Sequence, residues 1–352
     1  MTTKTKEHCY LLADIGATNV RFALAHDHDD VMTLTPSSVW LTALHTTLDE
    51  ALHAYLDQQG RPKLDAVAVC AAGPIEGEGR SARIRMTNCP WDVSVASLVD
   101  ATGITAPLLM NDFAALALSV PHLADSELRP LGGSEPPSAT GPKVVIGAGT
   151  GLGVGSLVWG GSSRIAIPGE GGHIDLAPGN AREIAVLHQL MLEYGHVSAE
   201  RVLSGPGLVS LYRALASLSG APPASNPMAV DIAARARAGS CPLCVETISL
   251  FCGWLGAVAG DLALILGAHG GVYVGGGIVP GWIATADADG KPLFDAALFR
   301  RRFEAKGRFA PYMARIPIFV MMREDPALLG LAHAAAGAIM PPQAPSPGRL
   351  SL

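Results

Sequence analysis

The chain has 352 residues, of which 49% are hydrophobic and 16% are charged. This composition is typical of a folded globular protein and excludes the disordered class. Because one hydrophobic core rarely serves more than about 300 residues, the length favours two packed lobes. The net charge of −6 and the lack of any basic run argue against a nucleic-acid partner.

The cysteines and the first residues bear on the compartment. Six cysteines are spread along the chain without the spacing of a disulfide framework. The opening MTTKTKEHCY lacks the apolar segment of a signal peptide. The longest apolar stretch, 247–260, is shorter than the ~20 residues that a membrane span needs, so we interpret it as a buried core helix. The sequence therefore predicts a cytoplasmic protein with no membrane segment.

The first predicted element is a hairpin. Apolar strands at 10–14 and 20–25 flank a short turn that holds Gly, Thr and Asn. A helix-spaced apolar pattern then runs over 41–56, and an apolar run over 65–72 ends in Gly-Pro. The order strand, helix, strand is typical of an α/β protein.

A second strand and helix follow in this half of the chain. The residues at 107–110 predict a strand, and those at 113–120 predict a helix. Asn111 and Asp112 therefore fall at a strand-to-helix corner. Such corners, at the carboxyl ends of strands in an open α/β sheet, are where ligands bind.

The second half repeats the opening of the first. A Gly/Ser/Pro-rich loop at 132–142 precedes a second apolar hairpin at 144–160. A strand with three glycines is predicted at 272–280, and the tail at 341–352 is predicted to be disordered. Helices are predicted near 182–193, 207–218, 227–238 and 246–267.

Glycines set the chemistry of the second hairpin. Those that alternate from 147 to 155 leave one of its faces bare, and Thr150 lies at its turn. Exposed N–H groups in such a turn form a concave anion site. One turn alone is more often a tight hairpin, but two turns and the glycines at 275–277 favour phosphate binding. No Walker P-loop or dinucleotide fingerprint is present.

Two aspartates at strand ends have both a structural and a functional interpretation. Asp14 is either a turn-forming residue or a carboxylate that faces a phosphate-bound magnesium ion. Asp112 precedes an apolar helix, where Asp is a favoured N-cap. It is also a candidate for the carboxylate that accepts a hydroxyl proton in phosphoryl transfer.

Further candidates lie in the second half. Glu170 and His173 share a Gly/Pro-rich loop and suit the hydroxyl groups of a polyol, although a lone His is more often structural. Glu200 follows a possible helix cap at Ser198, which gives it the ordinary role of a helix-dipole partner. The CxxC motif at 241–244 lacks a second pair of ligands, so we expect no metal there.

Taken in chain order, these stretches resemble the bacterial glucokinase family. The resemblance runs from about residue 10 to about residue 335 with the motif order preserved. The motifs that carry it are DIGATN at 14–19, NDF at 111–113, GAGTGLGV at 147–154, PGEGGH at 168–173, GHVSAERVLSGPGL at 195–208 and GGVYVGGGIVP at 270–280.

The resemblance implies a glucokinase that transfers the γ-phosphoryl of MgATP to the 6-hydroxyl of D-glucose. It implies that Asp112 is the general base and that glucose is held by Asn111, Asp112, Glu170, His173 and Glu200. It also implies that Asp14 lies on the magnesium side. The residues implied to contact ATP are Asp14, Gly16, Ala17, Thr18, Asn19, Gly149, Thr150, Gly151, Gly275, Gly276 and Gly277.

The implied fold is the two-lobed, actin-like (ribonuclease H-like) ATPase fold with its active site in the interlobe cleft. The expected small α/β lobe comprises 1–122 and 324–340, and the expected large α/β lobe comprises 123–323. A homodimer is expected by resemblance alone. The cysteine cluster of the related zinc-containing sugar kinases and repressors is missing after His173, so zinc is not implied.

One position departs from the family pattern. Members commonly have a second glycine in the first turn, where this chain has Ala17. If the backbone there required a positive φ, Ala would add strain.

Two other functions are possible on this fold. A sugar-responsive repressor would need a DNA-binding domain ahead of Tyr10. Only nine residues precede Tyr10 in this sequence, which argues against that function. A polymerising actin-like ATPase is the other possibility, but that function would not explain the presence of Asn111, Asp112 and the loop at 168–178.

Overall fold

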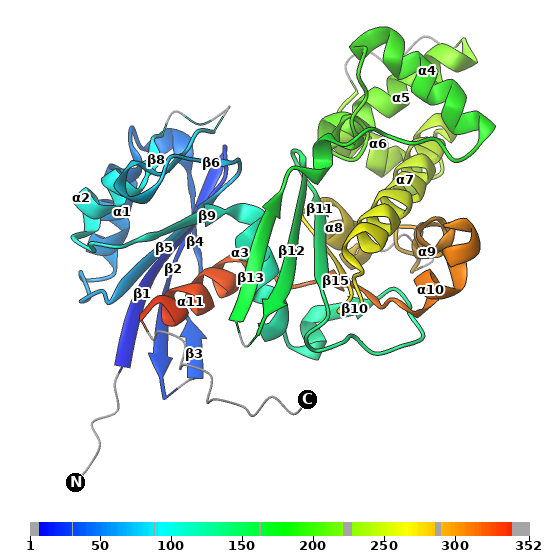
Figure 1. Cartoon of the computed structure of the whole chain (residues 1–352). Helices are drawn as coiled ribbons and strands as arrows, with labels where there is room; N and C mark the ends of the chain where they lie inside the picture. The colour runs from blue at the N-terminus through cyan, green and yellow to red at the C-terminus, as the bar shows by residue number, and fades with distance from the viewer. Residues whose placement is uncertain are drawn as a thin grey trace, which may run out of the picture. The chain divides into compact units, whose positions relative to one another are not determined.

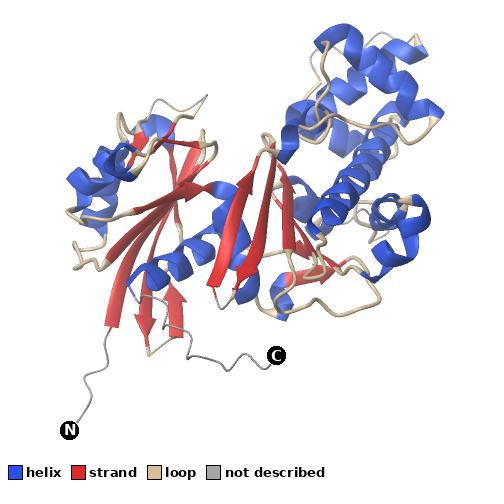
Figure 2. Cartoon of the chain, in the orientation of Figure 1, coloured by secondary structure: helices blue, strands red, loops and turns tan. Residues whose placement is uncertain are grey.

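The computed structural model describes residues 7–29, 31–86, 89, 91–161, 163–220, 227–285 and 290–339. The chain divides into two compact units, shown in Figure 1. Unit 1 comprises Met1–Leu123, Trp159–Pro168 and Arg323–Leu352, and unit 2 comprises Ala124–Val158 and Gly169–Met322. Both mix helices and strands, which confirms the predicted α/β class (Figure 2). The tail predicted to be disordered, 341–352, lies outside the described residues.

Unit 1 is built on a mixed sheet that opens with the predicted hairpin. Strand β1 (Glu7–Ile15) pairs antiparallel with β2 (Asn19–His28) and parallel with β5 (Ala66–Ala71). Strand β9 (Leu108–Asn111) adds parallel to β5. The order in the sheet is β3-β2-β1-β5-β9, and β4 also pairs with β2.

Both faces of this sheet are covered, which explains why its strands are apolar throughout. Alternate residues of β1 enter two different cores, because successive side chains point to opposite faces. Leu11 and Ile15 pack with helices α1 and α2, and Tyr10 and Leu12 pack with α3 and α11. The helices of unit 1 are α1 (Leu48–Gln58), α2 (Val95–Thr102), α3 (Asp112–Ser119) and α11 (Pro326–Ile339). Its short strands are β3 (Val31–Leu34), β4 (Ser38–Leu41), β6 (Ile75–Glu76), β7 (Arg83–Ile84) and β8 (Val93–Ser94).

The second sheet has the order β10-β15-β14-β11-β12-β13. Its central strand β11 pairs antiparallel with β12 and parallel with β14, which repeats the pattern around β1. The strands are β10 (Leu128–Pro130), β11 (Lys143–Ala148), β12 (Leu152–Gly160), β13 (Ser163–Gly169), β14 (Val272–Gly275) and β15 (Ile318–Met321). The helices of unit 2 are α4 (Ala181–Tyr194), α5 (Gly205–Ser219), α6 (Ala229–Arg237), α7 (Pro242–Leu266), α8 (Ile278–Ala284), α9 (Ala296–Glu304) and α10 (Ala310–Arg315).

The strand predicted at 272–280 is shorter than expected. It ends at Gly275, and Ile278 already begins α8. The chain turns at Gly276, whose φ of 76° lies in the left-handed region that favours glycine. The prediction was wrong here because the apolar IVP that follows the glycines has a composition that suits a strand and a helix equally.

Helix α7 is the core helix of unit 2. At 25 residues it is long and apolar enough to cross a membrane by length and composition. However, 72% of the apolar 18-residue stretch that meets this test is buried inside the protein. It packs on α5, α6 and α9, and the Trp254 indole Nε1–H donates to the Ala177 carbonyl at 3.1 Å. The predicted buried core helix is therefore confirmed, with its start moved to Pro242, a favoured first residue of a helix.

Close packing of α11 on α3 depends on a glycine. Gly330 of α11 is buried, and a Cβ there would overlap the Ala115 carbonyl oxygen of α3. At Gly337, two turns later on the same helix, an added Cβ would have no atom within 4 Å. The backbone of α3 therefore lies too close to Gly330 for any larger residue at that position.

This contact yields a stability prediction. Gly330→Ala should lower the free energy of unfolding by about 1–3 kcal/mol, because the added methyl forces the helices apart. Gly337→Ala is the matched control, and it should be neutral or stabilising by up to about 1 kcal/mol through helix propensity. Urea unfolding followed by circular dichroism measures both. Equal midpoints for the two variants would contradict the proposed close approach.

Candidate functional site

In unit 1 the parallel strands bring the candidate residues to one edge of the sheet. The strand register sets Asp14 beside Cys70, and Cys70 beside Met110. Asn111 lies opposite Ala71 one residue later. Because the carboxyl ends of neighbouring parallel strands share an edge, Asp14 and Asn111 lie at the same side of unit 1. Strand β9 ends at Asn111 and α3 begins at Asp112, which confirms the predicted strand-to-helix corner.

Asn111, and not Asp112, is the N-cap of α3. The Asn111 Oδ1 accepts hydrogen bonds from the backbone N–H groups of Phe113 and Ala114, the latter at 3.2 Å. Its Nδ2 donates to the Gly73 carbonyl at 3.2 Å. Asp112 is the first residue of the helix, so the structural interpretation of Asp112 as the cap is wrong. A carboxylate at this position is stabilised by the positive end of the helix dipole.

Asp14 stands in a setting that disfavours its negative charge. The Cys70 thiol donates to Asp14 Oδ1 at 3.5 Å, and Arg21 lies opposite on the neighbouring strand. Burial raises the pKa of the Asp14 carboxyl, although Arg21 and Cys70 act in the other direction and Asp325 adds to the rise. A cation beside this carboxylate would supply the charge that its surroundings lack.

Cys70 is the residue of this edge that the sequence did not single out. It is completely buried, and burial raises the pKa of its thiol well above the ordinary value. The charges of Asp14 and Asp112 raise that pKa further, so the thiol lies near both carboxylates. The signal that could have found it was the parallel alignment of 65–72 with the first strand.

The first turn tolerates Ala17. Gly16 N–H donates to the Asn19 carbonyl at 2.8 Å and closes the turn. Thr42 fixes the turn from outside, since its hydroxyl donates to the Ala17 carbonyl at 2.7 Å and its N–H to the Thr18 carbonyl at 3.0 Å. Among the described residues other than glycine, only two have a positive φ, and Ala17 is not one of them. The strain considered for this position is therefore not found.

In unit 2 the turn of the second hairpin is equally tight. Gly149 N–H donates to the Gly151 carbonyl, and Gly205 N–H donates to the Gly149 carbonyl, both at 2.8 Å. Thr150 is exposed at the tip. The glycines that follow β14 lie next to this turn, because Gly147 pairs with Gly275. Gly276 and Gly277 are exposed, so their backbone is accessible to a ligand.

The loop that carries Glu170 and His173 packs on the same hairpin. Residues 171–173 form a short 3₁₀ turn rather than an irregular loop. A Cβ on Gly172 would overlap the Leu152 carbonyl, and one on Gly171 would meet Val154 at 2.9 Å. These glycines let the loop lie directly on β12, while Glu170 and His173 themselves are exposed.

Backbone hydrogen bonds join this loop to the segment that holds Glu200. Leu176 N–H donates to the Val197 carbonyl at 3.1 Å, and Ala199 N–H donates to the Ile174 carbonyl at 2.9 Å. Glu200 then accepts a hydrogen bond from the Leu152 N–H at 2.9 Å. Glu200 is therefore more than the helix-dipole partner that the sequence suggested, because its carboxylate contacts the glycine turn.

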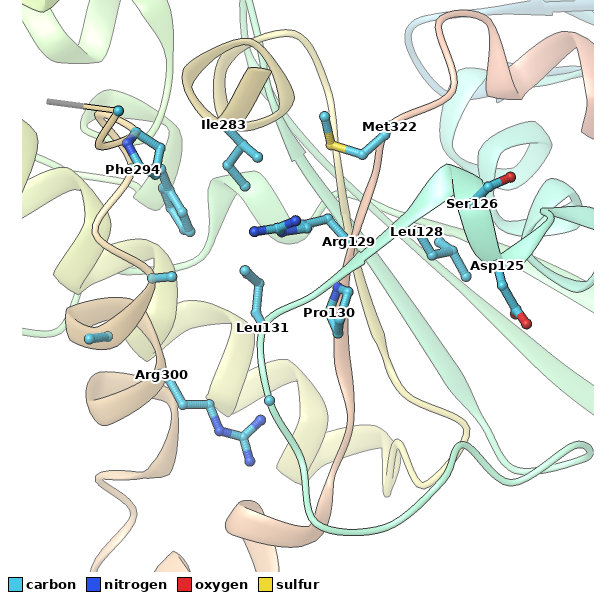
Figure 3. Close-up of a pocket in the computed structure, with 15 residues that line it drawn as sticks. Asp125, Ser126, Leu128, Arg129, Pro130, Leu131, Ile283, Phe294, Arg300 and Met322 are labelled. Atoms are coloured by element: carbon cyan, nitrogen blue, oxygen red, sulfur yellow. The ribbon is translucent and has the colours of Figure 1, made fainter. Parts of the chain in front are cut away.

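A separate cavity of about 1000 Å³ lies elsewhere in unit 2 (Figure 3). Its wall is mainly apolar and includes Leu131, Ile283 and Phe294. The Arg300 guanidinium at its edge donates to the backbone carbonyls of Ile316 and Ala314, each at 2.8 Å. None of the predicted site residues lines this cavity. The hydrogen bonds of Arg300 hold the backbone at 314–316 in place, which is a structural role.

The CxxC motif begins α7. Cys241 is the N-cap and Cys244 lies in the first turn, and both are buried free cysteines. Burial raises the pKa of Cys244 to about 12. Burial also acts to raise the pKa of Cys241, but hydrogen bonds from Cys244 and the charge of Arg235 outweigh it and lower that pKa. Within the described residues, no group of three or more His, Cys, Asp or Glu side chains is arranged to hold a metal ion.

The two units define the class of the protein. Each has a central strand that pairs with an antiparallel hairpin partner on one side and a parallel strand on the other. Each also presents a hairpin turn of small residues. This duplicated arrangement is that of the two-lobed, actin-like kinases.

Comparison with known proteins gives the family. The Glucokinase family model matches residues 11–338. The glucokinase of Aromatoleum aromaticum is 46% identical over 333 residues, which cover 94% of this chain and 95% of that protein. The crystal structure of a glucokinase from an Antarctic psychrotroph has a TM-score of 0.82 at 32% identity and covers 94% of this chain and 99% of that chain. A ROK family glucokinase from Streptomyces griseus, solved in complex with glucose and AMPPNP, shares the fold with a TM-score of 0.59 at 19% identity, covering 93% of this chain and 99% of that one. The chain belongs to the glucokinase family, which confirms the resemblance seen in the sequence.

Proposed function

We propose that this member of the glucokinase family transfers the γ-phosphoryl of MgATP to the 6-hydroxyl of D-glucose, giving glucose 6-phosphate and ADP. The observation that carries the proposal is the family match over 11–338, which includes every residue of the candidate site. The geometry supports it, because Asp14 lies just before the turn at 16–19 and the Glu200 carboxylate accepts the Leu152 N–H directly after the turn at 149–151. In this fold, catalysis is mostly positioning and charge stabilisation.

Asp112 is the proposed general base. Its carboxylate accepts the proton of the 6-hydroxyl as that oxygen attacks the γ-phosphorus and the bond to ADP breaks. The start of α3 suits this role, since Asn111 takes over the capping and Asp112 is half-buried. A side chain at the start of a helix is also held in its position more precisely than a side chain on a loop.

The proposed glucose ligands carry carboxylate, amide or imidazole groups. They are Asn111, Asp112, Glu170, His173 and Glu200. Carboxylate, amide and imidazole groups are suitable partners for sugar hydroxyls, because a carboxylate accepts hydrogen bonds and an amide or a neutral imidazole can both accept and donate them. The exposure of Glu170 and His173 on a loop held by its glycines is what such a ligand pair requires.

The two glycine turns are the proposed phosphate contacts, at 16–19 and 149–151, and the glycines at 275–277 are proposed to lie near the adenosine. Asp14 fits the magnesium side, because it is a single carboxylate whose pKa burial raises and Mg²⁺ needs only one or two protein carboxylates. When bound, the ion neutralises charge on the transferring phosphate.

Other parts of the proposal rest on the resemblance alone. They are a homodimeric assembly, a cytoplasmic location and a place in glycolysis. We also propose that unit 1 corresponds to the expected small lobe, 1–122 with 324–340, and unit 2 to the large lobe, 123–323. Analytical ultracentrifugation tests the assembly.

The reaction itself is tested by coupled measurement of ADP release with and without glucose. Release that requires glucose supports the kinase, whereas release without any sugar favours an ATPase and no release favours a regulator on the same fold. A panel of glucose, mannose and fructose then defines the hexose preference.

Asp112→Asn should lower kcat by about 10²- to 10⁴-fold, because the amide keeps the shape but cannot accept the proton. Circular dichroism should show an unchanged fold. The matched control is Asp100→Asn, since Asp100 is an exposed carboxylate of unit 1 that pairs with Arg80 on the surface. Turnover of Asp112→Asn at the level of this control would refute the assignment.

His173→Ala and Glu170→Gln should each weaken glucose binding, by about 5- to 150-fold, because a sugar hydroxyl loses its partner in the bound state. ATP affinity should change little. Calorimetric titration with each ligand distinguishes the two effects. His196→Ala is the control, since His196 is an exposed histidine of the neighbouring segment and pairs with Asp175 at 2.7 Å. Weaker ATP binding with glucose binding kept would contradict the assignment.

A further inference from the structure

The carboxylate of Glu200 links two parts of unit 2 that the proposed function assigns to different substrates. One of its oxygens, Oε2, accepts the Leu152 N–H at 2.9 Å, directly after the turn at 149–151. Glu200 itself belongs to the segment proposed to bind sugar. An ionised carboxylate has two oxygens and about four acceptor positions, so one hydrogen bond to Leu152 leaves Oε1 available.

Gly151 makes room for this contact. A Cβ at position 151 would lie 2.5 Å from Glu200 Oε2, which is closer than the two atoms can stand. The backbone of Gly151 is not in the left-handed region, so its φ does not demand glycine. Space for the Glu200 carboxylate is thus a sufficient reason for glycine here, apart from any approach of a phosphate.

Further hydrogen bonds make the connection rigid. The Ser204 hydroxyl donates to the Glu200 carbonyl at 2.8 Å, and Gly205 N–H donates to the Gly149 carbonyl at 2.8 Å. The segment that carries Glu200 is therefore tied to both sides of the turn. A shift of the turn must move Glu200, and the reverse holds as well.

We infer that Glu200 is a positioning residue for the nucleotide turn as well as a sugar ligand, and that Gly151 is a determinant of glucose affinity. This inference rests on the proposed function, and it assigns a second role to residues of the same site. A glucose hydroxyl that donates to Oε1 fixes the position of the Glu200 carboxylate. The carboxylate then fixes the Leu152 N–H and, through it, the turn at 149–151. If bound glucose orders the turn in this way, it raises the affinity for the nucleotide. By thermodynamic reciprocity, the bound nucleotide must then raise the affinity for glucose by the same factor.

The first test compares two glycines of unit 2. Gly151→Ala places a methyl against Glu200 Oε2 and displaces the carboxylate, so glucose binding without nucleotide should weaken about tenfold. Gly281→Ala is the matched variant, because Gly281 lies on α8 outside the proposed site and a Cβ there has no atom within 4 Å. Its glucose affinity should equal that of the unaltered chain. Calorimetric titration of each full-length protein with glucose measures both.

The second test removes the carboxylate. Glu200→Ala leaves the Leu152 N–H without its acceptor, so MgADP binding in the absence of glucose should weaken about three- to tenfold. Glu200→Gln keeps an acceptor oxygen and should restore most of that affinity. A residue that served only as a sugar ligand would leave MgADP binding unchanged in both variants. Circular dichroism verifies that each variant is folded.

The outcomes separate the inference from the function on which it rests. If the unaltered chain does not bind glucose, the proposed function fails. If it binds glucose but Gly151→Ala and Gly281→Ala have equal glucose affinity, the inference fails and the function stands. Equal MgADP affinity of Glu200→Ala and the unaltered chain would likewise overturn the positioning role.

Discussion

Parallel pairing of strands is the constraint on which both units depend. A parallel strand needs a crossover connection, which puts helices on the faces of the sheet and buries the strands on both sides. In unit 1 this produces two cores, one on either face of β1, β5 and β9. The same pairing aligns the carboxyl ends of the strands, and therefore the residues that follow them. The location of Asp14 and Asn111 at one edge is a consequence of the register and not of any direct contact between them.

Burial at this edge has an electrostatic consequence. The Cys70 thiol lies beside Asp14 and within the electrostatic reach of Asp112, so a small, weakly polar group separates two acidic positions. A larger or charged side chain at the end of β5 would change the electrostatic surroundings of both carboxyls. Arg21 and Asp325 complete the surroundings of Asp14, joined by an ion pair of 3.0 Å. The edge is thus rich in charged groups.

Glycine has different physical roles at different positions of unit 2. At Gly276 the backbone conformation demands it, since φ is positive and a Cβ would also overlap Ala148. At Gly172 the reason is close packing of the loop at 168–178 on β12, and at Gly151 it is the Glu200 carboxylate. Gly149 has open space around it, so crowding by neighbouring atoms is not the reason for glycine there. A glycine-rich motif therefore combines several requirements that a sequence pattern does not distinguish.

The sequence by itself determined the local elements and the family. The two hairpins, helices α4 to α7 and the corner at Asn111 followed from short-range periodicity and turn composition, which depend on neighbours a few residues away. The tertiary structure decided which side chains meet. Glu200 and Leu152 are 48 positions apart, and Cys70 and Asp14 are 56 apart, so no local pattern could join them. It also decided that Asn111 rather than Asp112 caps α3, because the Asn111 amide finds a second partner in Gly73, 38 positions away in the sequence.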